Sequence, residues 1–225
     1  MTQVQAILFD MDGLIIDTER VYREGWRVGA KAAGEELPES FLKQTAGKSS
    51  KQTVAQLEKI VSDVTKIPLI RQIREAYFVE ELQANRIPLK PYFLESIRYL
   101  KTQHYVTALV TSTASQRTSQ IFEKYQLGAY FDEVVTGDLV QEAKPNPAIY
   151  QLALKKLQIE PHQGLVFEDS LVGARAAEAA GIPLVLIPEK NTGGVTHSAD
   201  WQNVLHEAPD FQAAMQWLRQ TKMIR

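Results

Sequence analysis

Short aliphatic runs recur along the chain, and stretches with helical spacing separate most of them. The runs have the length of strands and cover residues 4–9, 106–110, 133–135, 165–167 and 184–187. Strands that alternate with helices favour a parallel sheet, because parallel neighbours need long crossover connections. Right-handed crossovers place helices on both faces of the sheet. The pattern therefore predicts a three-layer α/β domain.

The interval between the first two predicted strands is too long for one crossover helix. Apolar residues recur at helical spacing from residue 19 to about residue 86, which predicts an inserted helical bundle, or cap. Pro88 and Pro91 restrict the backbone where this segment ends. We predict a cap over residues 18–89 and a core made of residues 1–17 and 90–225. The two hinges would lie near Asp17 and in the proline-containing segment.

The composition is that of an ordinary globular protein. The 225 residues are 44% hydrophobic and 23% charged, enough to bury a sizeable core. A formal net charge of -2 gives no electrostatic support for binding nucleic acid or an anionic membrane. We therefore expect small-molecule chemistry.

The chain contains no cysteine, which excludes disulfide scaffolds, thiolate nucleophiles and thiolate metal sites. A metal ion would have to be bound by oxygen or imidazole ligands. The apolar run near the start stops at Asp10 and is too short for a signal peptide or a membrane span. We expect a cytoplasmic protein.

Two carboxylates, Asp10 and Asp12, directly follow the first predicted strand. Residues two apart in an extended segment point the same way, so both side chains can face one reaction centre. Two like charges this close favour protonation of one of them, which suits an ionised nucleophile beside a protonated acid. Asp and Gly are also common in ordinary turns, so this motif alone leaves both interpretations open.

Three later segments carry polar side chains where a strand meets a helix. Thr111 and Ser112 offer hydroxyl and amide donors suited to phosphate oxygens, and Lys144 brings a cation on a proline-stiffened loop. Glu168 and Asp169, together with Asp10, could bind a hard cation. Each segment alone also suits helix capping or a surface lysine. Their combination at strand ends predicts a phosphate and metal site.

Four motifs in this order resemble those of the haloacid dehalogenase superfamily, in the branch similar to β-phosphoglucomutase and phosphoglycolate phosphatase. They read Phe9-Asp10-Met11-Asp12-Gly13, then Thr111, then Lys144-Pro145, then Phe167-Glu168-Asp169-Ser170. The resemblance spans nearly the whole chain. It implies a Rossmann-like core with an inserted helical cap.

The resemblance also implies roles. Asp10 would attack phosphorus and form an aspartyl-phosphate, while Asp12 would protonate the leaving oxygen and later deprotonate water. Mg²⁺ would be held by the Asp10 carboxylate, the Asp12 main-chain carbonyl and Asp169, with Glu168 as support. The transferring group would be stabilised by Lys144, Thr111 and Ser112.

Substrate choice would lie with the cap. The resemblance places Thr18 and Glu19 in the hinge and Gly47 and Lys48 in the specificity loop of the cap. Lys48 suits equally well a solvated lysine that precedes a helix cap.

The leading expectation is a Mg²⁺-dependent phosphatase, a monomer, that acts on a small phosphorylated metabolite such as a sugar phosphate. Asp12 argues against dehalogenation, because dehalogenases of the family lack an acid there. A sugar phosphomutase is the alternative, although Tyr22 stands where the similar mutases carry a histidine. A catalytically silent metabolite-binding protein is a further alternative, which the intact acidic motif residues disfavour.

Overall fold

The computed structural model describes residues 4–44, 50–188 and 201–224. Its strands form one parallel sheet in the order β3-β2-β1-β4-β5-β6. Their bounds are β1 Ala6–Phe9, β2 Val106–Val110, β3 Glu133–Val135, β4 Gly164–Glu168, β5 Leu184–Leu186 and β6 Val204–Glu207. The predicted parallel sheet is confirmed, with strand ends that differ by one or two residues.

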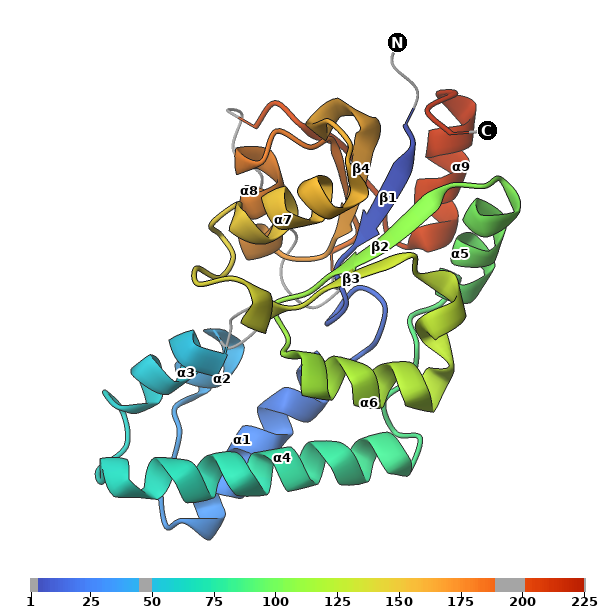
Figure 1. The fold of residues 1–225 in the computed structure, drawn as a ribbon. Coiled ribbons are helices and arrows are strands. Elements are labelled where there is room, and N and C mark those ends of the chain that lie inside the picture. Colours follow the sequence, from blue (N-terminus) through green and yellow to red (C-terminus); the bar gives the residue numbers. More distant parts are fainter. Residues whose placement is uncertain (1–3, 45–49, 189–200, 225) are drawn as a thin grey trace.

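Helices cover both faces of this sheet (Figure 1). Alternate strand residues point to opposite faces, so Ile7 and Phe9 belong to one hydrophobic cluster, and Ala6 and Leu8 to the other. The first cluster includes residues of α5 (Phe93–Thr102), α6 (Ser115–Tyr125) and α9 (Phe211–Gln220); the second includes residues of α7 (Ala148–Leu157) and α8 (Leu171–Ala179). The predicted three-layer α/β architecture is therefore confirmed.

The segment between β1 and α5 is helical and lies beyond the carboxyl ends of the strands (Figure 1). It contains α1 (Glu19–Ala32), α2 (Glu39–Gln44), α3 (Ser50–Leu57), the 3₁₀ turn η1 (Val64–Lys66) and α4 (Ile67–Gln83). The long helices α1 and α4 lie side by side. This segment has a hydrophobic cluster of its own, which includes Trp26, Phe41, Leu57 and Ile70. The inserted helical bundle is thus present as predicted.

The two segments predicted as hinges lie against each other. The Asp17 amide donates to the Pro88 carbonyl at 3.0 Å, and the Lys90 amide donates to the Ile15 carbonyl at 2.8 Å. The side chains of Lys90 and Asp17 also form an ion pair at 3.6 Å. The inserted segment therefore leaves and re-enters the core through one hydrogen-bonded junction.

The edge strand β6 was not predicted from the sequence. It contains His206, whose ring stacks on that of Trp217 of α9, with ring centroids 4.5 Å apart. Shorter 3₁₀ turns complete the chain: η2 (Leu127–Tyr130), η3 (Gly137–Leu139) and η4 (Pro161–Gln163). Within the described stretches, no helix has both the length and the hydropathy required to cross a membrane.

Candidate active site

The predicted chemical residues meet at the carboxyl edge of the sheet. Strand β1 lies between β2 and β4, and Phe9 is in register with both Leu109 and Phe167. Asp10 follows β1, Thr111 follows β2, and Glu168 and Asp169 stand at the end of β4. The sheet topology therefore brings together residues that are far apart in sequence.

Lys144 is the cation at the centre of this group. Its Nζ lies 2.6 Å from Asp10 Oδ1 and 2.6 Å from Glu168 Oε1, and it also donates to the Val110 carbonyl at 3.0 Å. Burial favours a neutral amine, but the carboxylates of Asp10 and Glu168 hold the pKa of Lys144 well above its usual value. Lys144 is therefore a buried ammonium ion held against Asp10.

The carboxylates of Asp10, Glu168 and Asp169 form a buried acidic triple, with one oxygen from each within 4.8 Å of the others. Burial raises the pKa of Asp10 to about 7, although Lys144 opposes this shift. Burial, and next the charge of Glu168, also raise the pKa of Asp169 well above its usual value. The single positive charge of Lys144 cannot neutralise three buried carboxylates, so excess negative charge remains at the site. Hard oxygen donors with excess negative charge fit a divalent cation such as Mg²⁺.

Both carboxylate oxygens of Glu168 accept hydrogen bonds from neighbouring groups. Its Oε1 accepts from the Tyr150 hydroxyl at 3.0 Å, and its Oε2 accepts from the Ser170 hydroxyl and the Asp169 amide, each at 3.1 Å. A Cβ on Gly173 would lie 1.7 Å from Glu168 Oε1, so the carboxylate occupies space that only glycine leaves open. We infer that Glu168 mainly supports Lys144 and the other two acids.

Asp12 has a separate environment. Its Oδ1 accepts from the hydroxyls of Thr18 and Tyr22, both at 2.8 Å, and its Oδ2 accepts from the Thr113 hydroxyl at 2.6 Å. Burial, and next the negative charge of Asp12, raise the pKa of Tyr22, so its hydroxyl stays protonated. The Thr111 hydroxyl also donates to Oδ2, at 3.5 Å. The Asp12 carboxylate is therefore oriented by four hydroxyl donors and lies outside the acidic triple.

These contacts add to the sequence interpretation at three residues. Thr113 was not predicted as a site residue, and Tyr22 was noted only as a departure from the similar mutases. Thr18, expected in the hinge as a tentative substrate residue, is fully buried and donates to Asp12 instead of lining the cleft. The hydroxyl-rich segment after β2 was the available signal for Thr113.

Thr111 and Ser112, which we predicted to bind phosphate, directly follow β2. Thr111 is buried, and its hydroxyl accepts from the Thr113 amide at 3.1 Å. The Ser112 hydroxyl is buried and has no hydrogen-bond partner among the described residues. An unpaired buried hydroxyl is costly, and a phosphate oxygen would satisfy it.

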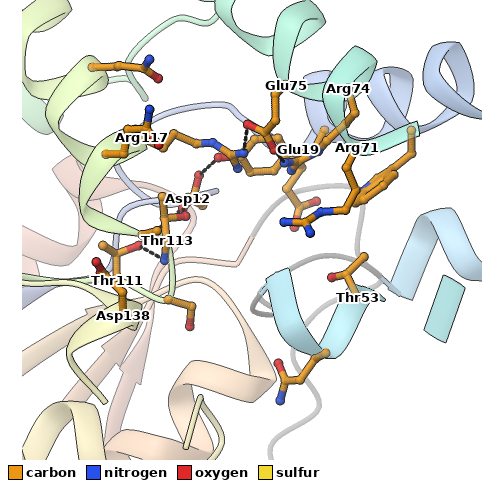
Figure 2. A pocket seen from close by; sticks show the side chains of 18 of the residues that line it. Asp12, Glu19, Thr53, Arg71, Arg74, Glu75, Thr111, Thr113, Arg117 and Asp138 are labelled. Carbon is orange, nitrogen blue, oxygen red and sulfur yellow. Dashed lines mark hydrogen bonds and ion pairs between the residues drawn. The ribbon is translucent and has the colours of Figure 1, made fainter. Parts of the chain in front are cut away.

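A cleft of about 1150 Å³ opens above these groups and extends to helices α1, α3 and α4 (Figure 2). Asp10, Asp12, Thr111, Ser112 and Lys144 line its sheet side. Glu19, another of the tentative substrate residues, also lines the cleft. Gly47 and Lys48, the other tentative substrate residues, lie outside the described residues.

The chain is similar to proteins of one family. Residues 7–187 match the family model described as haloacid dehalogenase-like hydrolase. The chain is 31% identical over 209 residues to a phosphorylated carbohydrates phosphatase from Thermotoga maritima, and the match covers 91% of each chain.

Several solved structures are also similar to this chain over almost its whole length. CbbY from Rhodobacter sphaeroides in complex with phosphate matches with a TM-score of 0.78 and 27% identity, covering 93% of this chain and 95% of that one. A CbbY variant in complex with xylulose-(1,5)bisphosphate matches with a TM-score of 0.77 over the same shares. A putative β-phosphoglucomutase from Thermotoga maritima matches with a TM-score of 0.71 and 27% identity, covering 96% and 99%. The chain belongs to the haloacid dehalogenase-like hydrolase family and is one of its phosphatases.

Proposed function

We propose that this protein is a Mg²⁺-dependent phosphatase that hydrolyses a sugar phosphate through an aspartyl-phosphate intermediate. The observation that carries the proposal is the arrangement of Asp10 and Asp12. Asp10 is held by a buried lysine, whereas Asp12 is held by four hydroxyl donors, and both side chains line the same cleft. Two carboxylates in different environments suit two different chemical roles.

In the first step, an Asp10 oxygen forms a bond to phosphorus while the bond from phosphorus to the sugar oxygen breaks. Asp12 gives its proton to that leaving oxygen. In the second step, Asp12 takes a proton from water, the water oxygen attacks phosphorus, and Asp10 is released with inorganic phosphate. The Lys144 ammonium, the Thr111 and Ser112 hydroxyls and nearby amides support the charge on the transferring group.

The acidic triple would hold the Mg²⁺ ion through Asp10 and Asp169, with the Asp12 main-chain carbonyl as an additional ligand. When bound, Mg²⁺ supplies positive charge that offsets the repulsion between the Asp10 carboxylate and the phosphate. Glu168 keeps Lys144 in place next to this site. The raised pKa values of Asp10 and Asp169 support this proposal, because a cation would stabilise their ionised forms.

The lining of the cleft supports a sugar as the leaving group. The volume of about 1150 Å³ is more than a two-carbon phosphate ester requires. Amide side chains, which both donate to and accept from hydroxyls, are common in the lining: Gln52, Gln72, Gln83, Gln116, Gln120 and Gln141. The relatives named for phosphorylated carbohydrates and for a bisphosphate sugar complex agree with this choice.

A screen of phosphate release tests the proposal. Hexose phosphates, pentose phosphates, nucleotides and phosphoglycolate are incubated with the protein, with and without Mg²⁺. We expect fastest release from a sugar phosphate, and only with the metal. Release from none of them would overturn the proposal.

The mutase alternative needs a separate product analysis. Incubation with β-glucose 1-phosphate and a bisphosphate primer distinguishes the two activities. Faster formation of glucose 6-phosphate than of free phosphate would make the protein a phosphomutase. We further propose residues 18–89 as the cap, and we expect a monomer located in the cytoplasm.

A further inference from the structure

Arg117 joins the core to the inserted helical segment. It belongs to α6, which follows β2, yet it ion-pairs with Glu75 of α4 (Figure 2). Its guanidinium carbon lies 5.1 Å from the ring centroid of Tyr22 in α1 and 5.0 Å from that of Phe78 in α4. One side chain of the core thus contacts both long helices of the insertion.

Tyr22 carries this contact to the site. The Arg117 guanidinium packs against the Tyr22 ring, and the Tyr22 hydroxyl donates to Asp12 Oδ1 at 2.8 Å. Arg74 of α4 packs on the same ring, with its guanidinium carbon 4.5 Å from the ring centroid, and it pairs with Glu75 at 2.5 Å. Tyr22 is therefore held by two arginines that Glu75 bridges.

The hydroxyl groups on Asp12 come from different parts of the fold. Thr113 follows strand β2, and Thr18 immediately precedes α1, whereas Tyr22 lies one turn inside α1. The Tyr22 hydrogen bond therefore depends on the position of α1 relative to the sheet. Arg117, which belongs to the core, fixes that position through its contacts with Glu75 and Tyr22.

We propose that Arg117 is a positioning residue for the acid–base step: by holding Tyr22 and Glu75, it keeps the Asp12 carboxylate directed at the leaving oxygen when the insertion is closed over the site. This inference rests on the proposed function. Arg117 acts through Tyr22 and need not touch the substrate. Misplacement of a general acid lowers the rate only of steps in which a proton moves.

Two phosphate esters test this role through kcat/KM, which reports the steps up to transfer of the phosphoryl group to Asp10. Glucose 6-phosphate has an alkoxide leaving group that needs the Asp12 proton, whereas 4-nitrophenyl phosphate releases a stable phenolate that does not. For Arg117→Met we expect a loss of about 10-fold with glucose 6-phosphate and less than about 3-fold with 4-nitrophenyl phosphate. An equal loss on both esters would mean a binding or structural role and would overturn the inference.

The variant Tyr22→Phe provides a second test of the role of Arg117. If Arg117 acts through Tyr22, the double variant Arg117→Met with Tyr22→Phe should be no worse than Tyr22→Phe alone on glucose 6-phosphate. Additive losses would show that Arg117 does not act through Tyr22 and would overturn the inference. Retained turnover of 4-nitrophenyl phosphate shows that each variant is folded.

Lys124 gives a matched control. It also lies on α6, and its Nζ donates to the Gln83 carbonyl of α4 at 3.1 Å, away from Tyr22. Lys124→Met should leave the ratio of the two kcat/KM values unchanged. A shift equal to that of Arg117→Met would show that any contact between α6 and α4 suffices, which overturns the specific role of Arg117. If the screen finds a better sugar phosphate than glucose 6-phosphate, that ester takes its place in this comparison. A wild-type protein that releases phosphate from no ester of the screen would overturn the proposed function, and this inference with it.

Discussion

Lys144 and Asp10 are 134 positions apart in sequence, yet their Nζ and Oδ1 atoms lie 2.6 Å apart with both side chains buried. The pair forms because Asp10 ends the central strand β1, while the loop before α7 brings Lys144 over the same edge of the sheet. A buried cation costs desolvation energy, and it is stable here because two carboxylates and a carbonyl accept its three protons.

Lys144→Met should both destabilise the protein and abolish turnover. Removing one partner from a buried pair leaves uncompensated charge and costs about 3–5 kcal/mol. Urea denaturation measures the stability, and phosphate release measures the turnover. Lys156, whose ion pair with Glu133 at 2.8 Å is partly exposed, is the control. Lys156→Met should cost less than about 1 kcal/mol, and an equal cost at both lysines would contradict the buried-pair argument.

Asp10→Asn should reduce turnover by at least roughly 1000-fold, because an amide cannot attack phosphorus. Circular dichroism should show an intact fold, since the substitution conserves shape and leaves Glu168 to pair with Lys144. Phosphate release with and without Mg²⁺ is the measurement. Retained metal-dependent release would show that Asp10 is not the nucleophile.

Asp12→Asn should separate the two halves of the reaction. With 4-nitrophenyl phosphate the first step needs little acid assistance, but water attack in the second step lacks its base. Phosphoenzyme should therefore accumulate, and an acid quench followed by intact mass measurement should detect one added phosphoryl group. If no phosphoenzyme is trapped, the acid–base role of Asp12 is wrong.

The metal-free protein should lose stability as the pH rises from about 4 to about 7. The pKa of Asp10 is raised from 3.8 to about 7 in the folded state. The folded protein therefore binds this proton more tightly than the unfolded chain does. The resulting stabilisation is complete below pH 3.8, the pKa of Asp10 in the unfolded chain, and is lost as the pH rises through about 7, its pKa in the folded protein. Thermal unfolding at pH 5 and pH 8 in a chelator measures this effect.

Two comparisons isolate the cause. Asp10→Asn should weaken the pH dependence, since only the raised pKa of Asp169 then remains, and make the metal-free protein more stable at pH 8 by roughly 1–2 kcal/mol. Mg²⁺ should stabilise the wild-type protein more at pH 8 than at pH 5, by roughly 3 kcal/mol at 100 times its dissociation constant. Equal stabilisation by Mg²⁺ at both pH values would argue against binding at the acidic triple.

Gly173→Ala should cost more than roughly 2 kcal/mol, because the new Cβ would lie 1.7 Å from Glu168 Oε1 and force that buried carboxylate to move. Gly128 is the control, since a Cβ there would meet nothing within 4 Å. Gly128→Ala should change the free energy of unfolding by less than about 0.5 kcal/mol. Similar values at both glycines would mean that Glu168 relaxes without cost.

The sequence allowed prediction of the sheet and of the residues on its carboxyl edge. Strand patterns are local, and parallel topology brings strand ends together, so the proximity of Asp10, Thr111 and Asp169 followed from their positions. Strand β6 was not predicted because it is a short edge strand whose residues are only partly buried. Edge strands carry a weaker hydrophobic signal than central ones.

The contacts above Asp12 could not be predicted in the same way. Tyr22, Arg117 and Glu75 come from three different helices, and their meeting depends on the angle at which the insertion lies over the sheet. That angle is set by packing, which no sequence spacing encodes. Asp12 was predictable from its motif as the proposed general acid, whereas the groups that orient it were not.

The backbone of Asp17 pairs with that of Pro88, and the backbone of Ile15 pairs with that of Lys90, so the chain leaves and re-enters the core at one place. A helical segment of another length could be joined at that place without changing the path of the strands. Val21, Phe78 and Leu82 of the insertion belong to the core cluster, and Tyr22 donates to Asp12, so a graft would have to keep these side chains. Exchange of the insertion should therefore preserve the core only when the surface of α1 and α4 that meets the sheet is kept unchanged.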